Sequence, residues 1–141
     1  MTPEDLAATT ASIMGHEGFA AKPQPDAQRS QVIGYGHSLT FNTLTQRAGL
    51  AILTDDLNAT LTALIAEWPP FTTCDGPRQQ MVAELAYQCG VNGALGFKDT
   101  LHYIAIKSYG PAIAALRNSD LARKYPARVA DYVALLEQPH A

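Results

Sequence analysis

The sequence predicts an α+β chain that is mostly helical, with one small β element near its N-terminus. Apolar residues recur at steps of three and four over most of the 141 residues, as they do on one face of a helix. The β-branched pair Val32-Ile33 is the clearest strand signal. No repeat, linker or low-complexity run divides the sequence, so we expect a single domain over 1–141, which is long enough to bury a core.

The first helix is expected to begin after Thr2, which is a good N-cap residue. Pro3 then takes the first helical position, where its missing N–H costs nothing. Gly15 and Gly18 bracket the end of the apolar pattern, so Glu17 should stand at or just past the last turn.

Residues 19–30 are expected to form a loop, because Pro23, Pro25 and Asp26 interrupt any regular pattern there. A strand should follow at Val32-Ile33. The alternating glycines Gly34 and Gly36 would let a ligand approach the backbone closely.

The remaining chain is expected to form helices separated by helix-breaking residues. One long helix is expected over Thr45–Trp68, ended by Pro69-Pro70. Its apolar positions follow helical spacing: Leu50, Leu53, Leu57, Leu61, Leu64, Ile65 and Trp68. Another helix should open at Gly76-Pro77, with Gly90 and Gly93 at its end. Further helices should fill 97–136, with breaks at Gly110-Pro111, Asn118-Ser119 and Tyr125-Pro126.

The charge and composition of the chain exclude some classes of binding partner. The net charge of −3 gives no general basic surface, so no nucleic-acid partner is expected. A local basic cluster at Arg117, Arg123, Lys124 and Arg128 is equally typical of a binding patch and of a solvated helix face. The sequence contains no run of about 18 apolar residues, so no membrane span is expected. The four histidines lack ligand spacing, so we expect no metal and no cofactor.

Two carboxylates could support glycoside hydrolysis, which needs one carboxylic acid and one carboxylate. Glu17 stands where a helix dipole and partial burial would both favour the protonated form. Asp26 follows nine positions later in a polar loop, where an ionised form is expected. Taken alone, each is more typical of an ordinary surface glutamate or turn aspartate.

Three separated blocks resemble the phage-type lysozymes (endolysins) of glycoside hydrolase family 24, to which the T-even phage lysozyme belongs. The first block combines His16-Glu17-Gly18-Phe19, the loop 22–26 and Ile33-Gly34-Tyr35-Gly36-His37, with Glu17 and Asp26 separated as in the family. The second, 87–97, is similar to the family's central helix and glycine turn. The third, 119–128 with Asp131-Tyr132 beyond, resembles its C-terminal arginine segment.

The resemblance implies a role for individual residues. Glu17 matches the general acid, Asp26 the carboxylate that activates a water, and Arg128 an arginine that pairs with the acid and orients it. Positions that match the substrate cleft are Gly36, Tyr87, Gln88, Phe97 and Thr100, although packing alone would also explain Tyr87 and Phe97. His37 and Asp56 match a structural pair that supports stability rather than catalysis.

The sequence departs from the family pattern at two points. Val32 stands where the family has a threonine that helps to place the attacking water, so this task would fall to Asp26, Ser30 or Gln31. Lost positioning of this kind costs roughly 10- to 1000-fold in rate. Only six residues separate His37 from the helix start at Leu44-Thr45, which implies a reduced β lobe.

The resemblance therefore implies a lysozyme-like fold in three parts: a small β lobe over about 18–44, an inter-lobe helix over about 45–68, and a helical lobe from 1–17 and 69–141. It implies a monomeric muramidase that cuts the β-1,4 bond between N-acetylmuramic acid and N-acetylglucosamine in peptidoglycan, by inversion. Such an endolysin would wait in the host bacterial cytoplasm before release to the cell wall.

Other functions fit the same residues. Val32 favours a lysozyme-like domain that binds glycan with weak or no turnover, whereas the retention of both Glu17 and Asp26 favours an enzyme. An antibacterial effector or a tail-associated muramidase would use the same chemistry in another setting. A purely structural helical adaptor would require all three matching blocks to be accidental.

Overall fold

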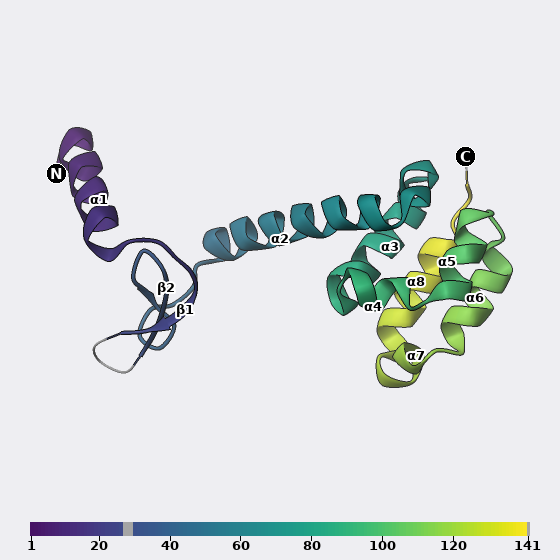
Figure 1. Ribbon diagram of the computed structural model, residues 1–141. Helices are drawn as coiled ribbons and strands as arrows, with labels where there is room; N and C mark the ends of the chain where they lie inside the picture. Colours follow the sequence, from purple (N-terminus) through teal and green to yellow (C-terminus); the bar gives the residue numbers. More distant parts are fainter. Residues whose placement is uncertain (27–29, 141) are drawn as a thin grey trace. The chain divides into compact units, whose positions relative to one another are not determined.

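The computed structural model describes residues 1–26 and 30–140 (Figure 1). It is mostly helical, with a three-stranded antiparallel sheet, so the expected α+β class is confirmed. The chain forms two compact units, 1–49 and 50–141, which we call the N-terminal unit and the C-terminal unit. The division into lysozyme-like lobes stays a prediction.

Helix α1 (Pro3–Glu17) begins and ends as its capping residues predict. The Thr2 hydroxyl accepts a hydrogen bond from the Asp5 N–H, and the Asp5 carboxylate accepts one from the Thr2 N–H, which completes a capping box. Gly18 stops the helix with a φ of 65°, and its N–H donates to the Met14 carbonyl. Glu17 is therefore the last helical residue, as expected.

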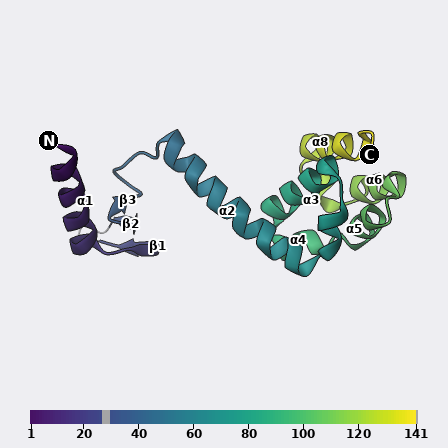
Figure 2. The ribbon, with the colours of Figure 1, turned by 90° about the horizontal axis from the view of Figure 1, so that it is seen from above.

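The sheet of the N-terminal unit has the order β1-β2-β3, with strands β1 (Ala20–Pro25), β2 (Gln31–Gly34) and β3 (His37–Ser38) (Figure 2). The strand expected at Val32-Ile33 is confirmed, but the loop expected over 19–30 is wrong at 20–25. Its positions 27–29 lie outside the described residues. Pro23 and Pro25 suggested a loop, yet an edge strand such as β1 tolerates prolines, because among the described residues no strand pairs with its outer side.

Helix α2 (Gln46–Glu67) matches the long helix expected from its periodicity to within one residue at each end. The 3₁₀ helix η1 (Pro69–Thr73) follows, since the two prolines cannot continue the α-helix. Within the described chain, α2 is the one helix whose length and composition would suffice to cross a membrane, with a mean hydropathy of 1.2 over its most apolar 18 residues. Asp55 and Asp56 stand near its middle, where a bilayer accepts charge only at high cost.

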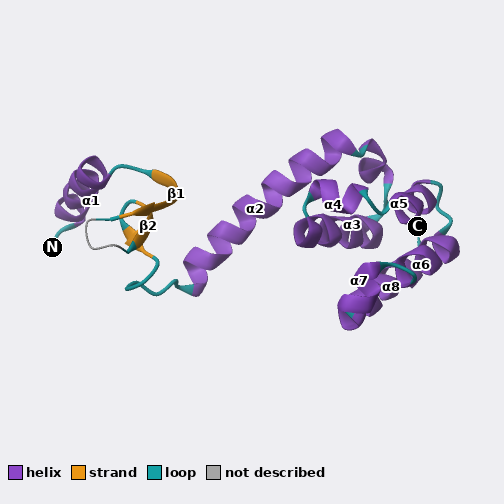
Figure 3. Ribbon diagram, turned by 60° about the horizontal axis from the view of Figure 1, so that its bottom comes forward, coloured by secondary structure: helices purple, strands orange, loops and turns teal. Residues whose placement is uncertain are grey.

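The C-terminal unit continues with six helices (Figure 3): α3 (Gly76–Cys89), α4 (Val91–Leu95), α5 (Lys98–Ala105), α6 (Tyr109–Arg117), α7 (Asp120–Lys124) and α8 (Pro126–Glu137). The helix end expected at Gly90 is confirmed, but Gly93 ends no helix and lies inside α4. The breaks expected at Asn118-Ser119 and Tyr125-Pro126 are confirmed. The break expected at Gly110-Pro111 is wrong, because Pro111 lies in the first turn of α6, where proline is tolerated. The chain turns at 106–108 instead, where Lys107 has a φ of 59°.

The hydrophobic core lies in the C-terminal unit. Its fully buried members include Leu64 of α2, Leu85 of α3 and Tyr132 of α8. Arg78 is buried in the same unit, 1% exposed, and donates to the carbonyls of Leu136 at 2.6 Å and Gln138 at 2.5 Å. One buried guanidinium therefore satisfies carbonyls at the end of α8 that no helical N–H can reach.

Candidate active site

The carboxyl group of Glu17 lies against the backbone of Gly36. Gly36 occupies the turn between β2 and β3 with a φ of 80°, and a Cβ atom built there would stand 3.0 Å from Glu17 Oε2. The end of α1 and the β2–β3 turn thus meet at a position where a side chain would strain the backbone and displace the carboxyl of Glu17. The sequence predicted that a ligand would approach the backbone at this glycine, and this stays a prediction; within the N-terminal unit the group that approaches Gly36 is the carboxyl of Glu17.

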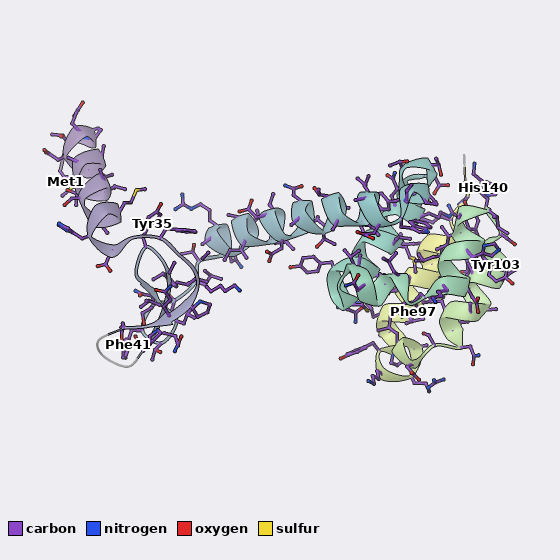
Figure 4. All side chains as sticks on the ribbon, in the orientation of Figure 1. Met1, Tyr35, Phe41, Phe97, Tyr103 and His140 are labelled. Atoms are coloured by element: carbon purple, nitrogen blue, oxygen red, sulfur yellow. The ribbon has the colours of Figure 1, made fainter. Side chains whose placement is uncertain are left out.

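Two aromatic rings lie beside this contact. Phe19 follows α1 and Tyr35 precedes Gly36, and their ring centroids are 5.3 Å apart at an interplanar angle of 53°. Both side chains are exposed, Phe19 at 68% and Tyr35 at 43% (Figure 4, where Tyr35 is labelled). The Glu17 side chain is also exposed, so the partial burial that we expected for it is not supplied by its own unit.

Asp26 is held by Ser30 across the end of the β1–β2 pair. The Ser30 N–H donates to Asp26 Oδ1 at 2.8 Å, and the Ser30 hydroxyl donates to Oδ2 at 2.6 Å. The Asp26 N–H in turn donates to the Ser30 carbonyl at 2.9 Å. Hydrogen bonds donated to both oxygens stabilise a carboxylate over its protonated form. The two bonds from Ser30 are therefore of the kind that favours a carboxylate, and the ionised state of Asp26 stays a prediction.

Val32 lies in the middle of this sheet. It pairs with Gln24 of β1 and with Ser38 of β3, and its side chain is half-buried. Gln31, which the sequence offered as a water-placing residue, is exposed, and its carbonyl accepts from the Leu39 N–H. The hydroxyl of Ser30, the other candidate, is directed at Asp26.

The C-terminal unit carries the other residues named by the resemblance. Tyr87 and Arg128 line one groove of about 340 Å³ together with leucines of α2. Phe97 and Thr100 line a second groove of about 490 Å³, formed with α6 and α7. Gln88 accepts a hydrogen bond from the Tyr132 hydroxyl at 3.0 Å, and this bond fixes its side chain. The unit thus brings Phe97 together with Thr100, and Tyr87 together with Arg128, the arginine expected to orient the acid.

His37 and Asp56 belong to different units, as do Glu17 and Arg128. His37 is half-buried in β3, and Asp56 is exposed on α2, where its carbonyl accepts from the Thr60 hydroxyl. The structural pair and the pairing of the acid with the arginine both stay predictions.

Sequence reasoning missed two features of the site. It proposed Ser30 as a group that places water, and did not foresee that both its amide and its hydroxyl bind Asp26. It also did not foresee that Glu17 would lie on Gly36. The spacing of Asp26 and Ser30, four residues apart before a strand, was the available signal, since such a pair can close a hairpin.

Comparison with protein-family models and with curated proteins gave no match for this chain. Among the described residues, no group of three or more histidine, cysteine or acidic side chains is arranged to hold a metal ion.

Proposed function

We propose that this chain is a muramidase with a lysozyme-like fold, which hydrolyses the β-1,4 bond between N-acetylmuramic acid and N-acetylglucosamine in bacterial peptidoglycan. The observation that carries the proposal is the placement of two different carboxyl groups in one compact unit. Glu17 ends a helix and lies on a glycine turn, and Asp26 is held by two donors at the neighbouring hairpin. The spacing and order of the resembling blocks add independent support.

In the proposed reaction Glu17 protonates the oxygen of the leaving sugar, while ionised Asp26 takes a proton from an attacking water on the opposite face. The position of Glu17 supports the acid role, because its exposed carboxyl group, at the end of α1 and against Gly36, is accessible to a substrate. A single displacement inverts the anomeric carbon and requires carboxyl groups about 6.5–9.5 Å apart. NMR of the first product, showing inverted configuration, tests this step.

The remaining site residues enter the proposal on the resemblance alone. We propose that Arg128 orients the acid and that Gly36, Tyr87, Gln88, Phe97 and Thr100 contact the glycan. His37 and Asp56 are proposed as a supporting pair. The proposed setting is that of a monomeric endolysin held in the host cytoplasm until release to the cell wall; an effector or tail-associated role would use the same chemistry.

The test uses the full chain on purified peptidoglycan, with clearing of turbidity and release of reducing ends as readouts. Glu17→Gln removes the acid and should lower the rate by about 100-fold or more. Glu4→Gln is the matched control, since Glu4 lies in the first turn of the same helix and should tolerate the change. Equal rates for wild type and Glu17→Gln contradict the proposal. Tight binding by the wild type without reducing ends supports the glycan-binding alternative instead.

A further inference from the structure

Ser30 and Asp26 are joined more closely than a hairpin requires. The backbone bond from the Asp26 N–H to the Ser30 carbonyl already continues the β1–β2 pairing beyond Pro25 and Gln31. The hydroxyl of Ser30 adds a further bond to Asp26 Oδ2 that no backbone pairing needs. At 2.6 Å this bond has the length of a hydroxyl that donates to a charged carboxylate.

Ser30 is also buried, at 5% exposed, in a unit whose other described side chains are mostly open to solvent. A buried hydroxyl needs a partner, and the partner here is the carboxylate that the proposed reaction uses as its base. The single donor proton of Ser30 is therefore engaged on Asp26 and is not available for donation to a water.

We propose that Ser30 is a positioning residue for Asp26. Its hydroxyl and amide hold the carboxylate in one orientation and in the charged form, so that Asp26 alone directs the attacking water. This arrangement would compensate for Val32, which offers no hydroxyl at the place where the family has one. The inference rests on the proposed function, because it assigns Ser30 a part in that same reaction.

The test compares three variants of the full chain by steady-state hydrolysis of soluble glycan fragments. Ser30→Ala removes only the hydroxyl and should lower kcat by about 10- to 100-fold, since misplacement of a reacting group costs that much. KM should stay within about twofold, because Ser30 is expected to touch no substrate. Ser30→Thr restores a hydroxyl and should recover most of kcat.

Ser38→Ala is the matched control. Ser38 is equally buried, at 8% exposed, in the same sheet, and its hydroxyl accepts from the N–H groups of Thr40 and Phe41 rather than binding Asp26. A merely structural role for Ser30 predicts that both alanine variants lose melting temperature and activity alike. The proposal predicts that only Ser30→Ala loses kcat at equal fraction folded.

The possible outcomes distinguish a failure of the proposed role of Ser30 from a failure of the proposed hydrolysis. Hydrolysis that depends on Glu17 but is unchanged in Ser30→Ala overturns the positioning role and leaves the function standing. Absence of any hydrolysis that depends on Glu17 overturns the function, and the role of Ser30 with it. Should Ser30→Ala melt below the assay temperature, Ser30→Thr and Ser30→Val replace it, because they share a shape and differ in the hydroxyl; equal kcat for these two would overturn the role.

Discussion

The two units of this protein are stabilised in different ways. In the C-terminal unit, apolar side chains from α2, η1 and α3 to α8 form one buried core. In the N-terminal unit, the described residues bury only Ser30 and Ser38, and apolar side chains such as Leu6 and Phe41 are exposed (Phe41 is labelled in Figure 4). Hydrogen bonds, a capping box and glycine turns define its local geometry instead.

This difference suggests that one unit stabilises the chain and the other carries the groups of the proposed reaction. Burial of apolar surface contributes most of the favourable free energy of folding, so the C-terminal unit should dominate the stability of the chain. Glu17 and Asp26, the carboxyl groups of the proposed reaction, both lie in the unit with little hydrophobic stabilisation. The positions of these two carboxyl groups depend on a few directional contacts. A single substitution can remove any one of them.

The largest effect on stability is expected at Arg78. Its guanidinium forms an ion pair with Asp75 at 3.3 Å, lies 4.1 Å from the centroid of the Tyr109 ring, and donates to two carbonyls near the end of α8. Arg78→Ala should lower the free energy of unfolding by about 3–5 kcal/mol, as loss of a buried charged partner does. Urea unfolding of the full chain measures this.

The control for that change is Arg123→Ala, which removes an arginine whose ion pair with Asp120 is exposed. Such a pair contributes about 0–1 kcal/mol. Similar losses for the two variants would show that Arg78 is not buried as described.

A matched pair of leucines tests the comparison between the units directly. Leu85 is 0% exposed in the C-terminal unit, and Leu6 is 59% exposed in the N-terminal unit. Leu85→Ala should lower the free energy of unfolding by about 2–5 kcal/mol. Leu6→Ala should change it by no more than about 0.5 kcal/mol, because it removes no buried contact. A loss of 2 kcal/mol at Leu6 would contradict the account of the N-terminal unit.

Gly36 and Gly34 form a second matched pair, within the N-terminal unit. Both have positive φ, at 80° and 65°, so alanine at either should cost about 1 kcal/mol of backbone strain. Only at Gly36 would the new Cβ meet Glu17; at Gly34 nothing lies within 4 Å. Gly36→Ala should therefore lower hydrolysis by about 10-fold or more, relative to Gly34→Ala, at a similar melting temperature. Equal activity would show that Glu17 does not act from this position.

The smallest effect is expected at Tyr132, whose buried hydroxyl donates to Gln88. Tyr132→Phe should cost about 1 kcal/mol at neutral pH, the net value of one hydrogen bond. Burial raises the pKa of the Tyr132 phenol, and the hydrogen bond and charge of Arg128 lower it by less.

A raised pKa means that the folded chain keeps the phenol proton at a pH where the unfolded chain has lost it. This contribution to stability is complete below about pH 10 and is lost as the pH rises through the folded pKa. Urea unfolding should be measured below and above about pH 10. As the pH rises, the free energy of unfolding should fall less for Tyr132→Phe than for wild type. Burial also raises the pKa values of Cys74 and Cys89, but the variant retains both thiols, so the difference reports the phenol. Parallel alkaline losses would contradict it.

Local signals predicted the helices well. Thr2, Pro3 and Gly18 specify the ends of α1 through contacts within a few residues, and Pro69 specifies the end of α2. Strand β1 was not predicted, because it forms through its pairing with β2. Its own sequence contains Pro23 and Pro25, which indicate a loop, and no local signal for a strand. Periodicity gave the apolar face of α2, but burial depends on partners distant in sequence, and of its residues only Leu64 is buried.

The candidate site was predictable in its residues and not in its contacts. The sequence placed Glu17 at a helix end and Asp26 before a strand, because capping and turn residues are local. The contact of Glu17 with Gly36 depends on how the chain returns through β1 and β2. The bonds between Ser30 and Asp26 depend on the register of the hairpin, which one residue of slip would change.

The most direct test of the central claim is mass spectrometry of muropeptides after digestion of peptidoglycan by the full chain in heavy-oxygen water. The account predicts fragments with N-acetylmuramic acid at the reducing end that carry one heavy oxygen, and predicts their loss in both Glu17→Gln and Asp26→Asn. Fragments with an internal anhydro bond and no heavy oxygen, or an unchanged digest in either variant, would contradict it.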